Sequence, residues 1–212
     1  MKKLYEEEPR LRLFHPRETL TKIHLDLFKI HRVIAPYASY YPEELTNLER
    51  LTLVLEDRRF FGHYWIDLIS SVREVFRALT FRRYGGASTI DMQLVRTATG
   101  YRKRTIGRKL YEMLLALLIQ FRYSKVVILR SYLRCAFFGS HLKGSNSAAF
   151  KVFGCSADDL CLDDAAFLAA MLVCPRPLDP KPEWTSRVKR RASHGKSVYL
   201  ANKQRFDQLP CG

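Results

Sequence analysis

The sequence EDRRFFGH, from Glu56 to His63, places two carboxylates between an apolar helical pattern and two aromatic residues. A helix that ends at Glu56 sets this carboxylate against the negative end of the helix dipole, which disfavours its ionised form. The two phenylalanines would exclude water and act in the same direction. A carboxylate in such surroundings can accept a proton near neutral pH as a general base. The alternative is a surface Glu-Asp pair that the two following arginines neutralise.

A glycine-rich loop, GGAST over residues 85–89, precedes the next helical pattern. Its glycines let the backbone approach a ligand closely, and a helix N-terminus offers free N–H groups to a phosphate. Thr89, Gln93 and Arg96 follow at spacings of four and three residues, so one helix face presents a hydroxyl, an amide and a guanidinium. This set suits a sugar or a pyrophosphate. The alternative is an ordinary loop followed by a helix cap.

Charged residues interrupt a strongly apolar helical segment at Arg108-Lys109-x-x-Glu112. Arg108 and Glu112 are four residues apart and therefore share one face of a helix. An unpaired charge among such apolar neighbours is costly. The pattern therefore indicates either functional groups or a structural Arg–Glu ion pair.

The segments that position these side chains have helical patterns. Thr46-x-x-Glu49 forms a capping box ahead of an apolar stripe that ends at Glu56, and Ser88-x-x-Asp91 forms a second capping box. Further helices are expected over residues 107–121, 125–138 and 162–173. No convincing strand alternation and no internal repeat is visible, so we expect a mostly α protein.

The 212 residues suffice for one domain with a sizeable core. We assign residues 1–36 to a charged N-terminal lead-in with some helical periodicity, and residues 37–180 to the domain that carries the features above. Residues 181–212 carry eight basic against two acidic residues, and we interpret them as a flexible, basic C-terminal tail.

The chain is strongly basic, with a formal net charge of +15 and a sequence pI near 9.8. Ten basic residues against Glu74 and Asp91 give the stretch from Arg73 to Lys109 a net charge of +8. Such an excess indicates a polyanionic partner, which could be nucleic acid, an acidic membrane surface or a phosphorylated substrate. No helix-turn-helix, zinc or RNA-binding signature is visible, so nucleic acid is the least favoured of the three.

The sequence predicts contact with a membrane surface rather than a span. No signal peptide is recognisable, and the longest uninterrupted apolar run, Met113–Ile119, is far shorter than the roughly 20 residues of a span. Residues 68–83 have apolar residues at helical spacing, with Arg73 and Arg77 off the stripe. This pattern is typical of a helix in a lipid interface, and equally of an amphipathic helix packed on the core.

The five cysteines form no C-x-x-C pair and have no histidine at metal-ligand spacing. Their odd number argues against a complete disulfide framework. We therefore expect free thiols.

Taken in order, these features resemble five motifs of the family 51 glycosyltransferases, the peptidoglycan-polymerising domains of penicillin-binding proteins and of monofunctional transglycosylases. Residues 56–63 resemble the first motif (E-D-x-x-F-x-x-H), residues 85–97 the second (G-G-S-T-x-x-Q-Q-L-x-K-N) and residues 108–112 the third (R-K-x-x-E). Residues 125–139 and 148–180 resemble the fourth and fifth. The resemblance covers roughly residues 40–180.

The resemblance implies a lysozyme-like, bilobal helical domain with an extended cleft. Such a domain acts peripherally on the cytoplasmic membrane, at its outer face, on lipid II and the growing glycan chain. Glu56 would take the proton from the acceptor 4-hydroxyl, which attacks the donor with inversion and expels undecaprenyl pyrophosphate. Glu112 would lie beside the donor pyrophosphate, holding a divalent cation (Mg or Mn) or the cationic side chains around it.

The resemblance also places substrate contacts at Ser88, Thr89, Gln93, Arg96, Arg108, Lys109 and Tyr132. Seven positions depart from the pattern. In the second motif the chain has Asp91 for Thr, Met92 for Gln, Arg96 for Lys and Thr97 for Asn. Elsewhere it has Trp65 for Gly, Arg130 for Glu and Arg134 for Asn. Arginine can still bind phosphate, and in a bidentate manner. The two changes in the fourth motif are expected to weaken the support of the helix that carries Glu56. They motivate the alternative of a catalytically impaired, lysozyme-like module that binds lipid-linked or polymeric peptidoglycan.

Overall fold

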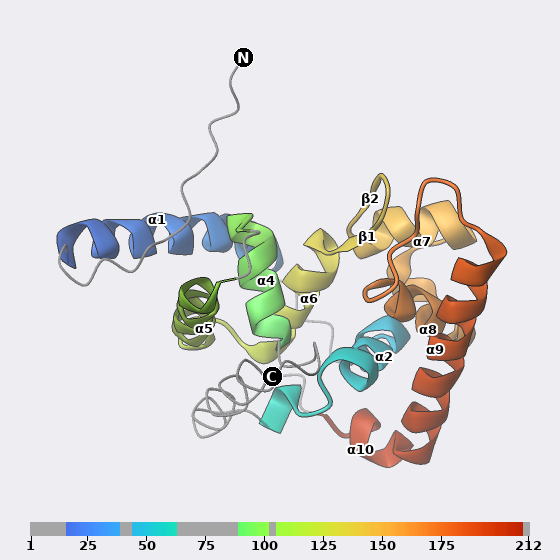
Figure 1. The fold of residues 1–212 in the computed structure, drawn as a ribbon. Coiled ribbons are helices and arrows are strands. Elements are labelled where there is room, and N and C mark those ends of the chain that lie inside the picture. The colour runs from blue at the N-terminus through green and yellow to red at the C-terminus, as the bar shows by residue number, and fades with distance from the viewer. Residues whose placement is uncertain (1–15, 39–43, 63–88, 102–104, 210–212) are drawn as a thin grey trace.

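The computed structural model describes residues 16–38, 44–62, 89–101 and 105–209, which are mostly helical (Figure 1). The α-helices are α1 (Pro16–Ile34), α2 (Asn47–Glu56), α4 (Ile90–Thr99), α5 (Ile106–Gln120), α6 (Lys125–Cys135), α7 (Ser145–Phe153), α8 (Leu162–Met171), α9 (Pro182–Ala201) and α10 (Lys203–Asp207). Short 3-10 helices cover Ala35–Tyr37, Phe60–Gly62 and Ala157–Asp159. The mostly α prediction is confirmed.

Hydroxyl side chains fix where several helices begin. The capping box predicted for α2 is present, because the Thr46 side chain accepts from the Glu49 N–H and the Glu49 carboxylate accepts from the Thr46 N–H. In α4 the N-cap is Thr89, whereas Ser88, the expected cap, lies outside the described residues. This start makes Met92 the third helical residue, so Asp91 takes no part in a capping box. Asp91 is instead buried.

A buried ion pair holds α4 against α6. The Lys125 ammonium lies 3.0 Å from an Asp91 carboxylate oxygen, and both side chains are almost fully buried. Burial raises the pKa of Asp91, and the charge of Lys125 opposes this shift. Lys125 also lies 4.5 Å above the ring of Phe60, which adds a cation–π contact. An aspartate that departs from the family pattern therefore has a structural role here.

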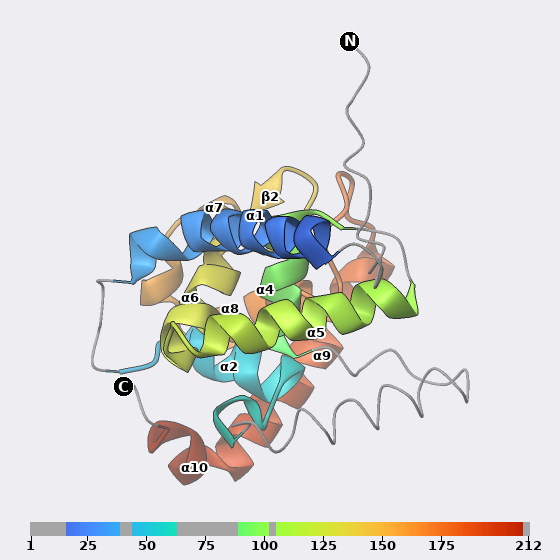
Figure 2. The ribbon, with the colours of Figure 1, turned by 90° about the vertical axis from the view of Figure 1, so that its left-hand side faces the viewer.

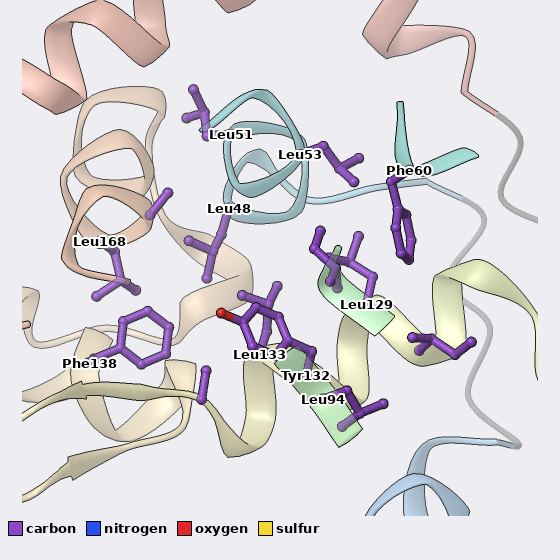
Figure 3. Packing of buried hydrophobic residues seen from close by; sticks show 14 of the residues in the cluster. Leu48, Leu51, Leu53, Phe60, Leu94, Leu129, Tyr132, Leu133, Phe138 and Leu168 are labelled. Atoms are coloured by element: carbon purple, nitrogen blue, oxygen red, sulfur yellow. The ribbon is translucent and has the colours of Figure 1, made fainter. Parts of the chain in front are cut away.

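The helices form two groups that share one core. On one side α1, α5 and α6 pack against α4, and on the other α8 packs between α2 and α9 (Figure 1). Viewed from the side, α1 and α5 run across the same face of the molecule (Figure 2). Leucines of α2, α4, α6 and α8 meet around Tyr132 and Phe138 (Figure 3). The helix that ends at Glu56 belongs to the second group, and its leucines face those of α4 and α6 in this core (Figure 3).

The N-terminal lead-in contributes to this core. Pro16–Ile34 of this segment form α1, whose Ile30 and Ile34 are fully buried. Asp26 of α1 is also buried and accepts hydrogen bonds from the hydroxyls of Tyr101 (2.7 Å) and Tyr111 (2.9 Å). These bonds tie α1 to Tyr101, which follows α4, and to α5.

The basic segment after residue 180 is not a flexible tail. It forms α9 and α10, and α9 packs along α8 and α2. Trp184, Val188, Ala192 and Tyr199 are buried, three of them at intervals of four residues, so most of the basic residues occupy the outer faces of an amphipathic helix. The many basic residues of the segment led to the prediction of a tail, although its apolar residues recur at helical spacing.

A small hairpin, β1 (Phe137–Gly139) and β2 (Leu142–Lys143), was not predicted. Strands of three and two residues are too short to show an alternating pattern. Four cysteines lie in the described part, and all four are free, as expected. Within the described ranges, no helix combines the length and the apolar character needed to cross a membrane. The stretch 68–83, expected at a lipid surface, lies outside these ranges.

Candidate active site

Glu56 is the last residue of α2, and its side chain is only 10% exposed. Its two carboxylate oxygens have different partners. Oε2 accepts from the Gln93 side-chain amide of α4 (3.2 Å), and Oε1 lies 3.3 Å from a guanidinium nitrogen of Arg191 in α9. Three helices therefore meet at this carboxylate.

Tyr132 fixes the orientation of the Gln93 amide. Its hydroxyl donates to Gln93 Oε1 at 2.6 Å, which turns the NH₂ group of Gln93 towards Glu56. Burial raises the pKa of Tyr132, and the negative charge of Glu56 adds to the shift. The phenol therefore keeps its proton and remains a donor. Through these two bonds the Gln93 amide presents a hydrogen-bond donor to Glu56.

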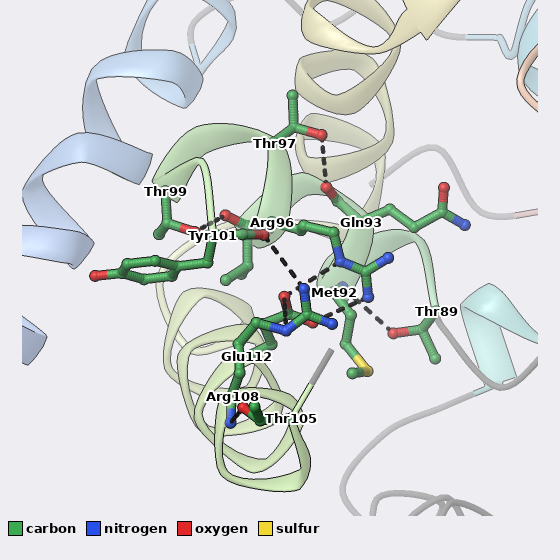
Figure 4. A network of polar contacts seen from close by, with 11 residues as sticks. Thr89, Met92, Gln93, Arg96, Thr97, Thr99, Tyr101, Thr105, Arg108 and Glu112 are labelled. Atoms are coloured by element: carbon green, nitrogen blue, oxygen red, sulfur yellow. Dashed lines mark hydrogen bonds and ion pairs between the residues drawn. The ribbon is translucent and has the colours of Figure 1, made fainter. Parts of the chain in front are cut away.

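Glu112, the second predicted carboxylate, is fully buried and serves as the centre of a cationic cluster (Figure 4). Arg96 of α4 binds it in a bidentate manner, with Nε 3.2 Å from Oε1 and Nη2 3.0 Å from Oε2. Arg108, one turn earlier in α5, brings its Nε to 3.4 Å from Oε1 and donates from Nη1 to the carbonyl of Tyr101. The predicted Arg108–Glu112 pair is present, and Arg96 joins it.

Lys109 adds a third cation beside this cluster. Burial lowers the pKa of Lys109, and the positive charges of Arg96 and Arg108 act in the same direction, against the charge of Glu112. Three cationic side chains thus surround one carboxylate. The cluster keeps an excess of positive charge, which a phosphate group would neutralise.

The two halves of the site are joined through α4. Gln93, which binds Glu56, and Arg96, which binds Glu112, are three residues apart and share one face of this helix. Tyr132 experiences the charges of both Glu56 and Arg96. The residues that bind Glu56 and Glu112 thus lie one helical turn apart on α4.

The other predicted contact residues contribute less in this structure. The Thr89 hydroxyl accepts from the Met92 N–H as a helix cap (3.5 Å). Ser88, and His63 and Trp65 of the first motif, lie outside the described residues. The Thr97 hydroxyl donates to the carbonyl of Gln93, and Met92 is buried in the core.

The donor atoms present do not fit a cation held by Glu112. Both of its oxygens already face guanidinium groups, which a cation would have to displace. In the part of the chain that the structure describes, no three His, Cys, Asp or Glu side chains gather closely enough to hold a metal ion. We therefore derive no step through a bound metal.

Both arginines of the fourth motif form ion pairs, and that of Arg130 supports α2. Arg130 Nε lies 2.7 Å from Glu49 Oε1, in a buried pair that also includes a hydrogen bond from Arg130 to the carbonyl of Glu44. Arg134 pairs at 3.2 Å with Asp158. Since Glu49 belongs to the helix that carries Glu56, the expected loss of support does not occur. The Arg130–Glu49 ion pair fastens this helix to α6.

Arg191 is a site residue that the sequence interpretation missed, because the segment was treated as a tail. The apolar positions 184, 188 and 192 at helical spacing would have indicated a packed helix. Its ion pair with Glu56 spans 135 residues of sequence, so no local pattern could have predicted the partner.

The chain matches the family model described as Transglycosylase over residues 26–198. Penicillin-binding protein 2a of Streptococcus pneumoniae is 40% identical over 134 residues, which cover 63% of this chain and 18% of that protein. Penicillin-binding protein 1A of Rickettsia bellii is 33% identical over 153 residues (70% and 19%), and that of Aquifex aeolicus 36% over 140 residues (66% and 19%). The chain belongs to the transglycosylase family.

The family match confirms the resemblance to the family 51 glycosyltransferases. The match begins inside α1 and ends inside α9, so it extends beyond both bounds of the predicted 37–180 domain. The chain spans less than a fifth of the length of the three relatives named above.

Proposed function

We propose that this chain is a peptidoglycan glycosyltransferase that polymerises lipid II into β-1,4-linked glycan and releases undecaprenyl pyrophosphate. One observation supports this most: the largely buried carboxylate of Glu56 and the cationic cluster around Glu112 are bound by residues of α4, Gln93 and Arg96, that lie one helical turn apart. Glycosyl transfer from a lipid diphosphate needs a base for the acceptor and positive charge for the leaving group. The site has both.

Glu56 is the general base of the proposed reaction. It accepts the proton of the acceptor 4-hydroxyl as this oxygen forms a bond to the anomeric carbon of the donor. The bond from that carbon to the diphosphate oxygen breaks, and its electron pair leaves with the diphosphate. Attack from the face opposite the leaving group inverts the anomeric centre, so an α-linked donor gives a β-link.

The cationic cluster stabilises the leaving group. Negative charge grows on the diphosphate as the bond breaks, and Arg96, Arg108 and Lys109 can bind it without rearranging. Glu112 neutralises part of the repulsion among these cations and fixes the two guanidinium planes. Its proposed role is therefore to position the cations, because its buried carboxylate has both oxygens engaged.

The alternative of a module that only binds peptidoglycan was motivated by Arg130 and Arg134. The Arg130–Glu49 pair keeps α2 attached to α6, and Arg134 pairs with Asp158, so these residues no longer favour an impaired site. Binding of lipid II without turnover in the wild-type protein would nevertheless establish that alternative.

The test is polymerisation of lipid II in detergent or vesicles, with wild type beside Glu56→Gln. Glutamine keeps the shape of the side chain and its contact with Gln93 but cannot accept the proton. We expect glycan strands from the wild type and a loss of at least about 100-fold in the variant, the usual contribution of a general base. A cooperative thermal unfolding transition within about 4 °C of that of the wild type would show that the variant is folded. Equal polymerisation by the two proteins would refute the role of Glu56.

A further inference from the structure

We propose that Asp26 of α1 is a positioning residue for the diphosphate: it fixes Tyr101, and the carbonyl of Tyr101 holds Arg108 in the cationic cluster. This inference rests on the proposed function for its catalytic meaning. Its physical core, the dependence of diphosphate binding on Asp26 and Tyr101, can be measured without any turnover.

Asp26 joins three segments of the chain at one buried point. One of its oxygens, Oδ2, accepts from the hydroxyls of Tyr101 (2.7 Å) and of Tyr111 in α5 (2.9 Å). The other oxygen, Oδ1, lies 3.4 Å from the ammonium of Lys29, one turn further along α1. The aspartate and both tyrosines are at most 5% exposed. Because buried polar groups need partners within the protein, these bonds fix the three side chains relative to one another.

The hydroxyl of Tyr111 remains a donor in this cluster. Burial raises the pKa of Tyr111, and the charge and the hydrogen bond of Asp26 act in the same direction. The phenol therefore keeps its proton. A carboxylate oxygen has lone pairs for two donors, so one oxygen of Asp26 can bind both tyrosines at once.

The backbone of Tyr101 continues the connection to the cationic cluster (Figure 4). Its carbonyl accepts from Arg108 Nη1 at 3.3 Å, while Arg108 Nε lies 3.4 Å from Glu112 Oε1. The side chain of Arg108 is only 8% exposed, so little water can replace these contacts. The direction of the guanidinium group therefore depends on where the Tyr101 carbonyl lies.

Tyr101 lies outside a helix, where side-chain contacts influence the position of a carbonyl. The helix α4 ends at Thr99, and Gly100 turns the chain away in a left-handed conformation, with φ 76°. After this turn the Tyr101 side chain binds Asp26 and contacts the ring of Tyr111 edge to face, with centroids 6.3 Å apart. Tyr111, by contrast, lies within α5, whose own hydrogen bonds hold its backbone.

A purely structural cluster would have different consequences. If Asp26 only fastens α1 to the core, removing either tyrosine hydroxyl lowers stability, and the folded protein binds diphosphate as before. If Asp26 positions Arg108 through Tyr101, loss of the Tyr101 hydroxyl weakens diphosphate binding, whereas loss of the Tyr111 hydroxyl does not. The comparison of the two hydroxyls therefore separates the two roles.

The experiment measures the binding of inorganic pyrophosphate by calorimetry, at a temperature where thermal unfolding shows each protein to be folded. Tyr101→Phe and Tyr111→Phe are a matched pair, because each removes one hydroxyl from the same oxygen of Asp26. We expect Tyr101→Phe to bind pyrophosphate roughly 3- to 10-fold more weakly than wild type, the contribution of about one hydrogen bond. Tyr111→Phe should bind it as wild type does.

Two variants of Asp26 test the aspartate itself. Asp26→Ala removes both acceptor oxygens and should weaken pyrophosphate binding as Tyr101→Phe does. Asp26→Asn can turn its remaining oxygen towards the two hydroxyls, so it should recover most of the affinity. If the alanine variant fails to fold, the two tyrosine variants carry the test.

The lipid II assay distinguishes failure of this inference from failure of the proposed function. In an active enzyme Tyr101→Phe should lower kcat by a similar factor with a smaller change in KM, because charge grows on the diphosphate as its bond breaks. Weaker pyrophosphate binding in Tyr101→Phe supports the inference even if wild type polymerises no lipid II, an outcome that would refute only the function. Equal pyrophosphate affinities of the two tyrosine variants, equal kcat values in an active enzyme, or no pyrophosphate binding by wild type overturn the inference.

Discussion

Replacing Glu112 by glutamine removes one negative charge from the centre of the cationic cluster. The carboxylate is fully buried, Arg108 is 8% exposed, and Arg96 is 37% exposed. Removing one partner of a buried ion pair usually costs about 3–5 kcal/mol, because the other charge stays buried without compensation. Glutamine keeps one acceptor oxygen, and water can reach Arg96. We therefore expect a loss near the lower end, about 3 kcal/mol.

Thermal unfolding followed by circular dichroism measures this loss. For a domain of this size about 1 kcal/mol corresponds to roughly 2–4 °C in Tm, so Glu112→Gln should unfold about 6–12 °C below wild type. Glu56→Gln is the matched control, because its ion pair with Arg191 is partly exposed and is worth only about 1 kcal/mol or less. It should lose no more than about 4 °C by the same conversion.

Equal Tm values for Glu112→Gln and wild type would refute the interpretation of Glu112 as the structural centre of the cluster. The expected result has a consequence for activity measurements. A loss of polymerisation in Glu112→Gln indicates a role in the reaction only at temperatures where the variant is fully folded. Without that check, loss of the fold would be mistaken for loss of chemistry.

Three further predictions concern other contacts of the site. Arg130→Met should lower the free energy of unfolding in urea by about 3 kcal/mol, because it leaves the buried Glu49 without its cation. Adding Glu49→Gln, which keeps the capping bond, should recover most of this loss, and no recovery would contradict the buried pair. Because the pKa of Lys109 is lowered, this side chain loses its positive charge sooner as pH rises. Calorimetry should therefore show that diphosphate binding weakens between pH 7 and 10, and that it weakens less in Lys109→Arg. Parallel pH profiles for the two proteins would contradict this. Gly195→Ala should destabilise by about 1–2 kcal/mol, since overpacking against Leu55 outweighs the gain in helix propensity, whereas an unchanged Tm would show that the helices can separate freely.

Local sequence determined the helices and the candidate carboxylates. The capping box at Thr46 fixed the start of α2, and the apolar stripe that follows it led to an end at Glu56, as found. The spacing of Arg108 and Glu112 predicted their contact, because residues four apart on a helix are neighbours. Such inferences succeed when the partners lie within one helical turn of each other.

Only the tertiary structure decided which distant charges pair. Glu56 finds Arg191 across 135 residues, and Arg130 finds Glu49 across 81. In the sequence, Arg191 is one of many basic residues in a charged segment. Arg130 stands where the family pattern has Glu, so the sequence indicates the loss of a supporting contact. A buried carboxylate needs a compensating positive charge, but the sequence alone offers several cations that could supply it. The packing of α9 and α6 against α2 selects the one that lies within reach.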